Sequence, residues 1–523
     1  MPLQPVARPL DPATVKAMLT DGREVALIDL REELIFSQSH LLWARSVPLS
    51  RLELRFAALV PRKATRIVLC DGGDGAVDRA ANILKAAGYT DLNVLQGGLP
   101  AWEKAGYELF SGVNVPSKAF GEHIEHVRHT PSVSPEELDG LIKSGIDMVV
   151  VDSRPFDEFQ RVSIPTATNV PGAELVLRIH DIAPSPETLV VVNCAGRTRS
   201  IIGAQSLINA GVPNKVVALR NGTMGYTLAG FKPDNGKTKR YAEPSAEGLA
   251  WAKTAAERVG KKFGIMQINR EGLTSFRNDV TRTLYVFDVR DPTEYAAGHL
   301  PGAINAPGGQ LVQATDQYVG TLGARIVLVD NQAVRAIMTA SWLKQMGWRD
   351  VFVLAGSGNE RVRPLAPVLG PAVPSELAIE VRELSGLVAN DHVTVVDLAL
   401  SPAYRRGHIP GAWYAIRTRL QPALAKVPMN GPLVLTSEDG ILAGLAAREA
   451  KVPARYLRGG NAAWHEAGLL LSTEARMADE PLDYWPKPYE RPGNTKDAMN
   501  EYLSWEVDLL PRIERDGTTR FMP

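Results

Sequence analysis

A short apolar run that ends in aspartate occurs four times along this chain of 523 residues. β-Branched runs of this kind are typical of buried strands. The spacings between successive aspartates are 123, 136 and 109 residues, which is longer than the 20–50-residue period of solenoid repeats. The sequence therefore predicts four tandem domains rather than one large core. The four aspartates are Asp29, Asp152, Asp288 and Asp397.

Every copy continues in the same way after its aspartate. A second apolar run, such as Val190-Val191-Val192, leads into a segment with helical periodicity. A third short run then ends in glycine, as at Leu219-Arg220-Asn221-Gly222. Strands that alternate with helices pair in parallel through right-handed crossovers. The predicted fold class is α/β.

The second copy places Cys194 where its strand gives way to a helix. At such a junction the loop amides and the unpaired N–H groups of the first helical turn point to one spot, and the helix dipole favours negative charge there. Arg197 and Arg199 add positive charge within a few residues. We therefore expect Cys194 to be a nucleophile that is used as its thiolate.

The motifs of the four copies, taken together, resemble those of the rhodanese (sulfurtransferase) family. These motifs are Asp-x-Arg, Gly-His-Ile/Leu-Pro-Gly-Ala, strand-Cys-x-x-x-x-Arg-Ser-helix and Leu-x-Gly-Gly-x-x-Ala-Trp, and they cover about residues 12–472. The resemblance implies four rhodanese-like domains, each a mostly parallel five-stranded sheet flanked by helices. It also implies a cysteine that carries sulfane sulfur as a persulfide, with no cofactor. The expected domains are 12–111, 130–232, 265–372 and 375–472, with a helical linker at 233–264 and an aromatic C-terminal extension at 473–523.

Only the second copy is expected to be catalytic. Cys194 follows its aspartate by 42 residues, and the same register places Asp71 and Asp330 at the cysteine position of the first and third copies. These carboxylates are expected to fill their own anion cradles. In the fourth copy Ser437 lies near this position, in a loop that we expect to be too short to hold an anion.

Cys70 precedes the cysteine position of the first copy by one residue. Successive side chains of a strand point to opposite faces, so Cys70 should face away from the site as a buried strand residue. The alternative is a second thiol that accepts sulfur from Cys194.

The expected roles in the second copy follow from the resemblance and from the chemistry of the loop. Cys194 is the catalytic residue, and Ser200 also fits an N-terminal helix cap. Asp152 and Arg154 match Asp-x-Arg and are expected to form an ion pair that supports the loop from below. The donor would be a small anion, thiosulfate or a persulfide, and the acceptor a thiol or cyanide. The substrate-binding candidates are Ala195, Gly196, Arg197, Thr198, Arg199 and Ser200.

Composition excludes several other classes. The 58 basic residues balance 58 acidic ones, which argues against nucleic acid or an anionic membrane as a partner, and no apolar run is long enough to span a bilayer. The N-terminus lacks a signal-peptide core, so a cytoplasmic location is expected. Two cysteines without ligand spacing indicate neither a disulfide framework nor a metal site. The histidines of 123–129 are expected in a solvated connection.

Two alternatives stay open. Cysteine-dependent phosphatases and arsenate reductases also place a cysteine at a helix start, but phosphatases need Cys-x5-Arg, whereas Cys194 and Arg199 form Cys-x4-Arg. A non-catalytic scaffold, in which Cys194 is incidental, is the other alternative. The aromatic extension, with a helix expected around Ala498–Leu510, should pack on its own protein or on a second copy in a homodimer.

Overall fold

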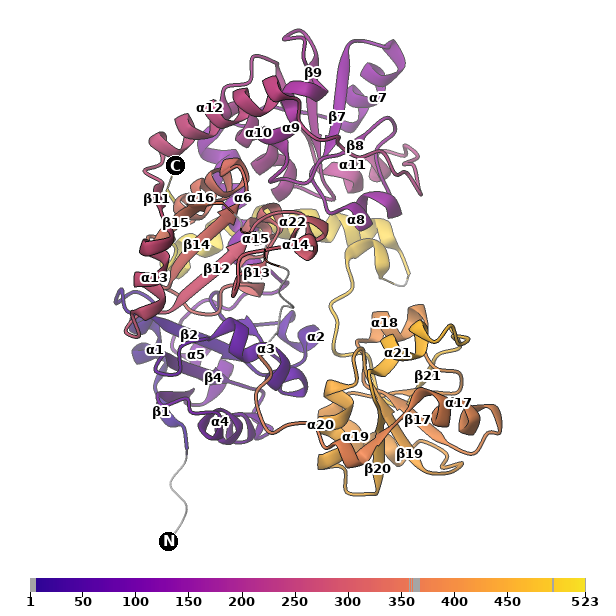
Figure 1. The fold of residues 1–523 in the computed structure, drawn as a ribbon. Coiled ribbons are helices and arrows are strands. Elements are labelled where there is room, and N and C mark those ends of the chain that lie inside the picture. The colour runs from indigo at the N-terminus through magenta and orange to yellow at the C-terminus, as the bar shows by residue number, and fades with distance from the viewer. Residues whose placement is uncertain (1–5, 357, 359, 361–366, 492, 523) are drawn as a thin grey trace.

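The computed structural model of the protein describes residues 6–522 apart from 357, 359, 361–366 and 492. In this part of the chain, four parallel sheets follow one another, each flanked by helices (Figure 1). Three sheets have five strands and the fourth has six. The predicted α/β class and the four tandem domains are confirmed.

The four sheets share one strand order, in which the first strand of each domain lies at one edge and the aspartate-ending strand lies beside the strand that leads to the cysteine position. The first sheet has the order β1-β5-β4-β2-β3. Its strands are β1 (Arg8–Leu10), β2 (Val25–Asp29), β3 (Arg45–Ser46), β4 (Arg66–Cys70) and β5 (Leu92–Leu95). Those of the second are β6 (Ser132–Val133), β7 (Met148–Asp152), β8 (Thr168–Asn169), β9 (Leu189–Asn193) and β10 (Val216–Leu219). Those of the third are β11 (Met266–Ile268), β12 (Leu284–Asp288), β13 (Ile304–Asn305), β14 (Arg325–Asp330) and β15 (Val351–Ala355), and those of the fourth are β16 (Ala378–Ile379), β17 (Thr394–Asp397), β18 (Trp413–Tyr414), β19 (Leu433–Thr436), β20 (Ala454–Leu457) and β21 (Arg476–Met477).

Helices cover both faces of each sheet, and none of those in the described residues is long and apolar enough to cross a membrane. The first domain holds α1 (Pro12–Met18), α2 (Glu33–Phe36), α3 (Leu52–Leu59), α4 (Ala76–Ala86) and α5 (Gly98–Lys104). The second holds α7 (Pro135–Ser144), α8 (Phe156–Arg161), α9 (Leu175–Ile182), α10 (Thr198–Ala210) and α11 (Gly222–Leu228). The third holds α13 (Arg270–Asn278), α14 (Pro292–Ala297), α15 (Gly308–Gln313) and α16 (Val334–Gln345). The fourth holds α17 (Val381–Ala389), α18 (Ser401–Arg406), α19 (Leu420–Leu424), α20 (Ile441–Glu449) and α21 (Gly460–Glu466), and the connections form α6 (Val115–Arg128), α12 (Ala246–Lys262), η5 (Pro488–Glu490) and α22 (Thr495–Asp516).

The uninterrupted apolar run of β9 is explained by burial on both faces of its sheet. Val190 and Val192 pack in a core with α9, α10 and α12, whereas Val191 packs in the opposite core with α7, α8 and α11. The strand is thereby fixed in position, and Cys194 follows it directly at the carboxyl edge of the sheet.

The connection between the first two domains is a helix with a buried face, so the expectation of a solvated linker is wrong. Phe120 and Ile124 of α6 are fully buried, and the ring of His123 contacts Phe120 and Phe521. The helix ends at His129, which has a left-handed φ of 51°. The alternation of apolar residues at helical spacing is interrupted by charged residues that turn out to be paired within the protein, which is why the sequence suggested a polar segment.

The predicted helical linker is present as α12, and it packs against α9 of the second domain and α16 of the third. Ala252, Ala255, Ala256 and Val259 lie in the same core as side chains of both domains. The linker therefore joins the second and third domains into one packed body.

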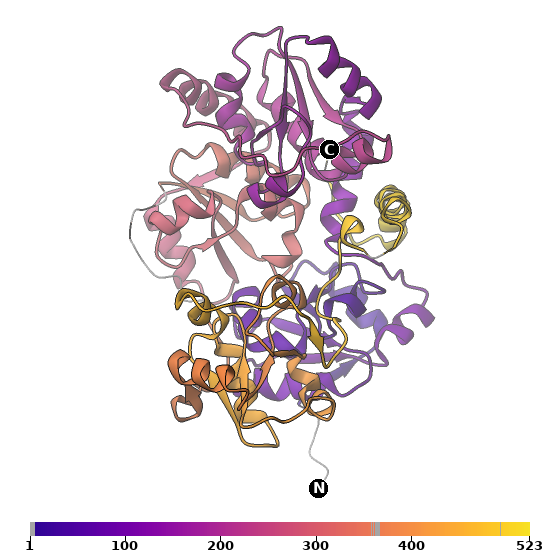
Figure 2. The same cartoon turned by 90° about the vertical axis from the view of Figure 1, so that its right-hand side faces the viewer.

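The C-terminal extension returns across the molecule, as predicted for packing on its own protein. Its first element, β21, adds a sixth strand to the fourth sheet, beside β18. The helix α22 is longer than expected, contains Pro511, and packs against α6. Figure 2 shows α22 end-on, beside the domains rather than within them. Residues from the far end of the chain thus reach the second domain.

Candidate active site

Cys194 lies at the junction predicted from the sequence, between the end of β9 and the start of α10. The residue is only 2% exposed, and its Sγ lies 3.4 Å from the hydroxyl oxygen of Ser200. The first backbone bond of the helix is donated by Ile201 to the carbonyl of Arg197. Within the described residues no group accepts a hydrogen bond from the amides of residues 195–200. These N–H groups are available to an anion on the sulfur.

The carbonyl side of the loop is held by the start of α11. The amide of Thr223 donates to the Cys194 carbonyl at 2.8 Å, and the amide of Met224 donates to the Ala195 carbonyl at 2.9 Å. Because these carbonyls are turned toward α11, the loop is fixed without using its own amides.

The predicted ion pair beneath the loop is confirmed. Arg154 donates from Nε and Nη2 to the two carboxylate oxygens of Asp152 at 2.9 and 2.7 Å, and both side chains are buried. Asn193, the residue before the cysteine, donates to Asp152 Oδ2 at 2.7 Å and to Thr223 Oγ1 at 3.1 Å. The pair is therefore linked to the loop through Asn193.

Arg197 and Arg199 line the cavity at Cys194, but carboxylates of the protein bind both of them. Arg197 donates to both oxygens of Glu122 at 2.7 Å, and Arg199 donates to those of Glu158 at 3.0 and 2.8 Å. Burial alone would lower the pKa of Arg199, but the Glu158 carboxylate more than offsets this and raises it. The two arginines are thus fixed cations whose charge is largely neutralised.

Ser200 is not the helix cap that the sequence suggested. The capping position is Arg197, and Ser200 is the third residue of α10. Its hydroxyl donates to the Arg197 carbonyl at 2.8 Å and lies within reach of the Cys194 thiol. A serine in a first helical turn bonds a local carbonyl as readily as it caps, so sequence alone could not decide.

A cavity of about 180 Å³ lies over Cys194 and is closed by other parts of the chain. Ala195, Gly196, Arg197, Thr198 and Arg199 line it together with Cys194, as predicted, whereas Ser200 does not. None of the residues from outside the second domain was predicted, and the only signal for them was the Trp-, Tyr- and Pro-rich composition of the extension. These residues are Glu33, Val113, Asn114, Lys118, Gln313, Gln317, Tyr484, Trp485, Lys487, Pro488, Tyr489 and Tyr502.

The α22 helix is tied to the loop by a buried carboxylate, Glu506. Its Oε1 accepts from Thr198 at 3.3 Å, from Tyr502 at 3.0 Å and from the ammonium of Lys118 at 2.8 Å. Burial alone would lower the pKa of Lys118, but Glu506 outweighs it and raises that pKa. This cluster joins α6, α10 and α22 at the back of the loop.

The other domains hold non-cysteine groups at the equivalent position, as the 42-residue register predicts. Asp71 accepts from the amides of Gly73 and Val77 at 2.9 and 3.0 Å. Asp330 accepts from the amide of Arg335 at 2.8 Å and from its side chain. Each aspartate therefore occupies the amides at the start of the helix that follows it.

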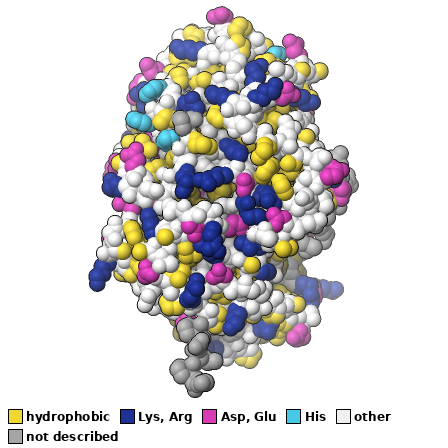
Figure 3. Space-filling model, turned by 90° about the vertical axis from the view of Figure 1, so that its left-hand side faces the viewer, with side chains coloured by type: hydrophobic (Ala, Val, Ile, Leu, Met, Phe, Trp, Pro, Cys, Tyr) yellow, Lys and Arg dark blue, Asp and Glu magenta, His cyan; other side chains and the backbone are white. Residues whose placement is uncertain are grey.

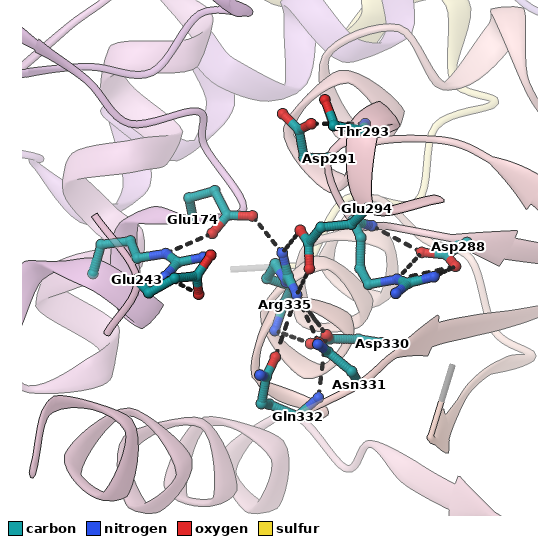
Figure 4. A network of polar contacts seen from close by, with 12 residues as sticks. Glu174, Glu243, Asp288, Asp291, Thr293, Glu294, Asp330, Asn331, Gln332 and Arg335 are labelled. Atoms are coloured by element: carbon teal, nitrogen blue, oxygen red, sulfur yellow. Dashed lines mark hydrogen bonds and ion pairs between the residues drawn. The ribbon is translucent and has the colours of Figure 1, made fainter. Parts of the chain in front are cut away.

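Arg335 extends this arrangement into an interdomain network (Figure 4). The guanidinium is buried and also pairs with Glu294 of its own domain and with Glu174 of the second domain, in each case at 2.6 Å. Asp330 is thus part of the contact between the second and third domains.

The expectation of a shortened loop in the fourth domain is wrong. Ser437 is followed by α20 after three intervening residues, as Cys194 is followed by α10. The Ser437 hydroxyl oxygen accepts from the amide of Ala443 at 3.2 Å, and so occupies the cysteine position. The helix was placed too early because Asp439-Gly440 caps it with a left-handed glycine rather than with a polar turn.

Cys70 is a buried strand residue, as expected. It lies in the core on one face of the first sheet, where its S–H donates to the carbonyl of Ile28 at 3.4 Å. Burial raises the pKa of this thiol well above its usual range. Its surroundings favour the neutral thiol and not a nucleophile.

Comparisons with known proteins agree with this architecture. A family model described as a rhodanese-like domain matches residues 11–105, 134–229, 273–360 and 380–467. The chain is similar to the crystal structure of a thiosulfate sulfurtransferase from Pseudomonas aeruginosa, with 44% identity, a TM-score of 0.93, and coverage of 98% of this chain and 99% of that chain.

Curated relatives match single domains. A probable adenylyltransferase/sulfurtransferase MoeZ from Mycobacterium tuberculosis is 31% identical over 96 residues, and an uncharacterized protein from Synechocystis is 35% identical over 92 residues. Each match covers 18% of this chain, which spans only 24% and 50% of the length of these two relatives.

Proposed function

Because the chain belongs to the rhodanese-like domain family, we infer that it is a sulfurtransferase in which Cys194 carries the sulfur. The observation that supports this most directly is the thiol at the start of α10, beside amides that have no partner in the described residues. Asp71, Asp330 and Ser437 occupy the corresponding positions elsewhere, so the second domain is the catalytic one and the first, third and fourth are inactive.

The reaction is a double displacement. The Cys194 thiolate attacks the outer sulfur of thiosulfate, the S–S bond of the donor breaks, and sulfite leaves with the electron pair. The amides of residues 195–200 stabilise the negative charge on the terminal sulfur of the resulting persulfide. An acceptor thiolate or cyanide then attacks that sulfur, and Cys194 leaves as the thiolate.

The substrates are small. A cavity of about 180 Å³ lies below the 300–1,000 Å³ typical of drug-sized ligand sites, so it suits thiosulfate, cyanide or a small persulfide. Since Arg197 and Arg199 are bound by carboxylates, Lys487 is the remaining cation that faces the donor's anionic group, and it is 35% exposed. Asp152 and Arg154 support the loop from below and do not contact substrate.

The two alternatives are less well supported. A phosphatase or arsenate reductase needs a free arginine after a longer loop, whereas Arg199 follows after four residues and is bound by Glu158. A scaffold gives no reason for a cysteine whose surrounding amides are left without acceptors and over which a cavity is built.

Incubation with thiosulfate, followed by mass spectrometry of the peptides, tests the proposal. We expect a mass increase of about 32 Da on Cys194, lost with reductant, and no sulfur transfer by Cys194→Ser. Cys70→Ser is the matched control and should keep full activity. Absence of an adduct with thiosulfate, mercaptopyruvate and glutathione persulfide would overturn the assignment.

The setting of the enzyme follows from the same reasoning. We place it in the cytoplasm, where low-molecular-weight thiols are available as acceptors. A homodimer is a further prediction, which light scattering of the full chain tests.

A further inference from the structure

A cavity of about 770 Å³ lies between the first and third domains, away from Cys194. Residues 19–24 lead into β2, and Arg62, Ala64 and Arg66 precede or begin β4. From the third domain, residues 281–282 precede β12 and 346–350 precede β15. The cleft therefore lies at the amino ends of both parallel sheets, whereas Asp71 and Asp330 lie at the carboxyl ends.

Positive charge is concentrated in this cleft, although the whole chain is balanced. The residues that line it include the carboxylates of Glu24, Asp91 and Asp350. Figure 3 looks onto the side of the molecule where α1 and α13 lie, and Lys and Arg side chains gather across the middle of that face. Six arginines line the cleft: Arg23, Arg62, Arg66, Arg282, Arg349 and Arg520.

Two of the arginines are held in place by one buried carboxylate. Glu24 accepts from Arg62 and from Arg282, each at 3.1 Å, and the amide of Thr283 donates to it at 2.8 Å. One negative charge is thus shared by two guanidinium groups, with a further contact from Arg282 to Asp350 at 2.6 Å. The geometry of these donors is fixed before any ligand arrives.

Three more arginines have no carboxylate partner. Among the described residues no acidic group lies within ion-pair distance of Arg23, Arg349 or Arg520, and Arg520 makes one hydrogen bond, to the carbonyl of Thr20 at 3.2 Å. Arg66 pairs with Asp21 outside the cleft lining at 2.7 Å. The cleft therefore combines fixed arginines with unpaired ones that come from the first domain, the third domain and the C-terminus.

We propose that this cleft binds a small molecule that carries several phosphate groups. Guanidinium groups bind phosphate oxygens through paired N–H donors, which a single charge in an open cleft would not exploit. The volume lies within the range of small-molecule sites. Since the ligand bridges the two domains and the C-terminal segment, its binding stabilises their packing.

Calorimetric titration of the full chain at low ionic strength tests this, with inorganic tripolyphosphate and ATP as probes and orthophosphate for comparison. We expect tripolyphosphate to bind, to raise the unfolding temperature, and to weaken with added salt. Tighter binding of ATP would show that the nucleoside is also contacted, whereas equal binding would assign recognition to the phosphate chain alone. Orthophosphate that binds as tightly as tripolyphosphate would overturn the multiple-phosphate class.

The double variant Arg23→Gln/Arg349→Gln removes two exposed, unpaired charges and should weaken tripolyphosphate binding at least about tenfold. The control Arg382→Gln/Arg406→Gln removes the same charge from exposed sites of the fourth domain and should leave binding unchanged. Both variants should keep the unfolding temperature of the free protein and its sulfur transfer. Equal weakening in both variants, or no binding by the unmodified chain, would refute the site.

Discussion

Gly222 offers the sharpest test of how α11 positions the cysteine loop. It is the first residue of α11 and has a left-handed φ of 55°. A Cβ atom added there would lie 2.4 Å from the Cys194 carbonyl oxygen and 2.8 Å from that of Gly196. Because these are backbone atoms, the contact can be relieved only by moving the loop.

The first domain provides a matched control in Gly98, which begins α5 with a φ of 58°. A Cβ atom there would lie 3.7 Å from its nearest neighbour, the Asp71 carbonyl oxygen. Both alanine variants bear the left-handed strain of about 1 kcal/mol. Only Gly222→Ala must also open a contact by about 0.6 Å, and since a 1 Å misplacement can cost about 100-fold in rate, we expect kcat/KM to fall about 10- to 100-fold, or about 1.4–2.7 kcal/mol.

The assay is transfer of sulfur from thiosulfate to cyanide, with thermal unfolding of each variant measured in parallel. Gly98→Ala should lower the unfolding temperature slightly and keep activity. Gly222→Ala should lose activity at temperatures where it is fully folded. If the two variants have the same kcat/KM within twofold, the loop is not positioned by α11 and the reasoning fails.

Four further predictions concern stability, pH and substrate binding. Asp71→Ala should destabilise the first domain by about 1 kcal/mol, because two amides at the start of α4 lose their acceptor, and an unchanged unfolding temperature would contradict this. Arg335→Met should cost about 3–5 kcal/mol in urea unfolding, because three carboxylates lose their buried partner. Burial raises the pKa of Asp397 to about 6 from about 4, so the stability of the fourth domain should be full below pH 4 and fall by about 3 kcal/mol as the pH rises through 6, and calorimetry of Asp397→Asn should show that dependence flattened. Lys487→Met should raise KM for thiosulfate about fivefold with kcat little changed, and an unchanged KM would remove Lys487 from donor binding.

The features that could be predicted from sequence are those contained in one strand, loop and helix. The position of Cys194, the replacement by Asp71 and Asp330, and the Asp152–Arg154 pair each depend on residues within one domain. Strand burial fixes the register, and register fixes which side chain meets the helix amides. Local sequence was less informative for Ser437, because a left-handed glycine cap leaves no polar signature at the helix start.

The walls of the cavity could not be predicted, because they depend on contacts between distant segments. Glu506 meets Thr198 across 308 residues, and Lys118 of α6 completes the same cluster. The charges of α6 suggested a solvated connection, yet Glu122 is the partner of Arg197. No periodicity within α6 or α22 reveals which charged residue will pair with which.

The three domains without cysteine still shape the site of the second. Glu33 of the first domain and Gln313 and Gln317 of the third line the cavity over Cys194, and the fourth domain is followed by the segment that carries Lys487. In each of these domains the amides that would stabilise a sulfur anion are used internally, by Asp71, Asp330 or Ser437. A filled position stabilises the start of its own helix, and in the third domain it also connects to the second through Arg335 and Glu174. Loss of the nucleophile therefore leaves a rigid domain that can serve as a wall, which accounts for a chain of four domains built around one reactive thiol.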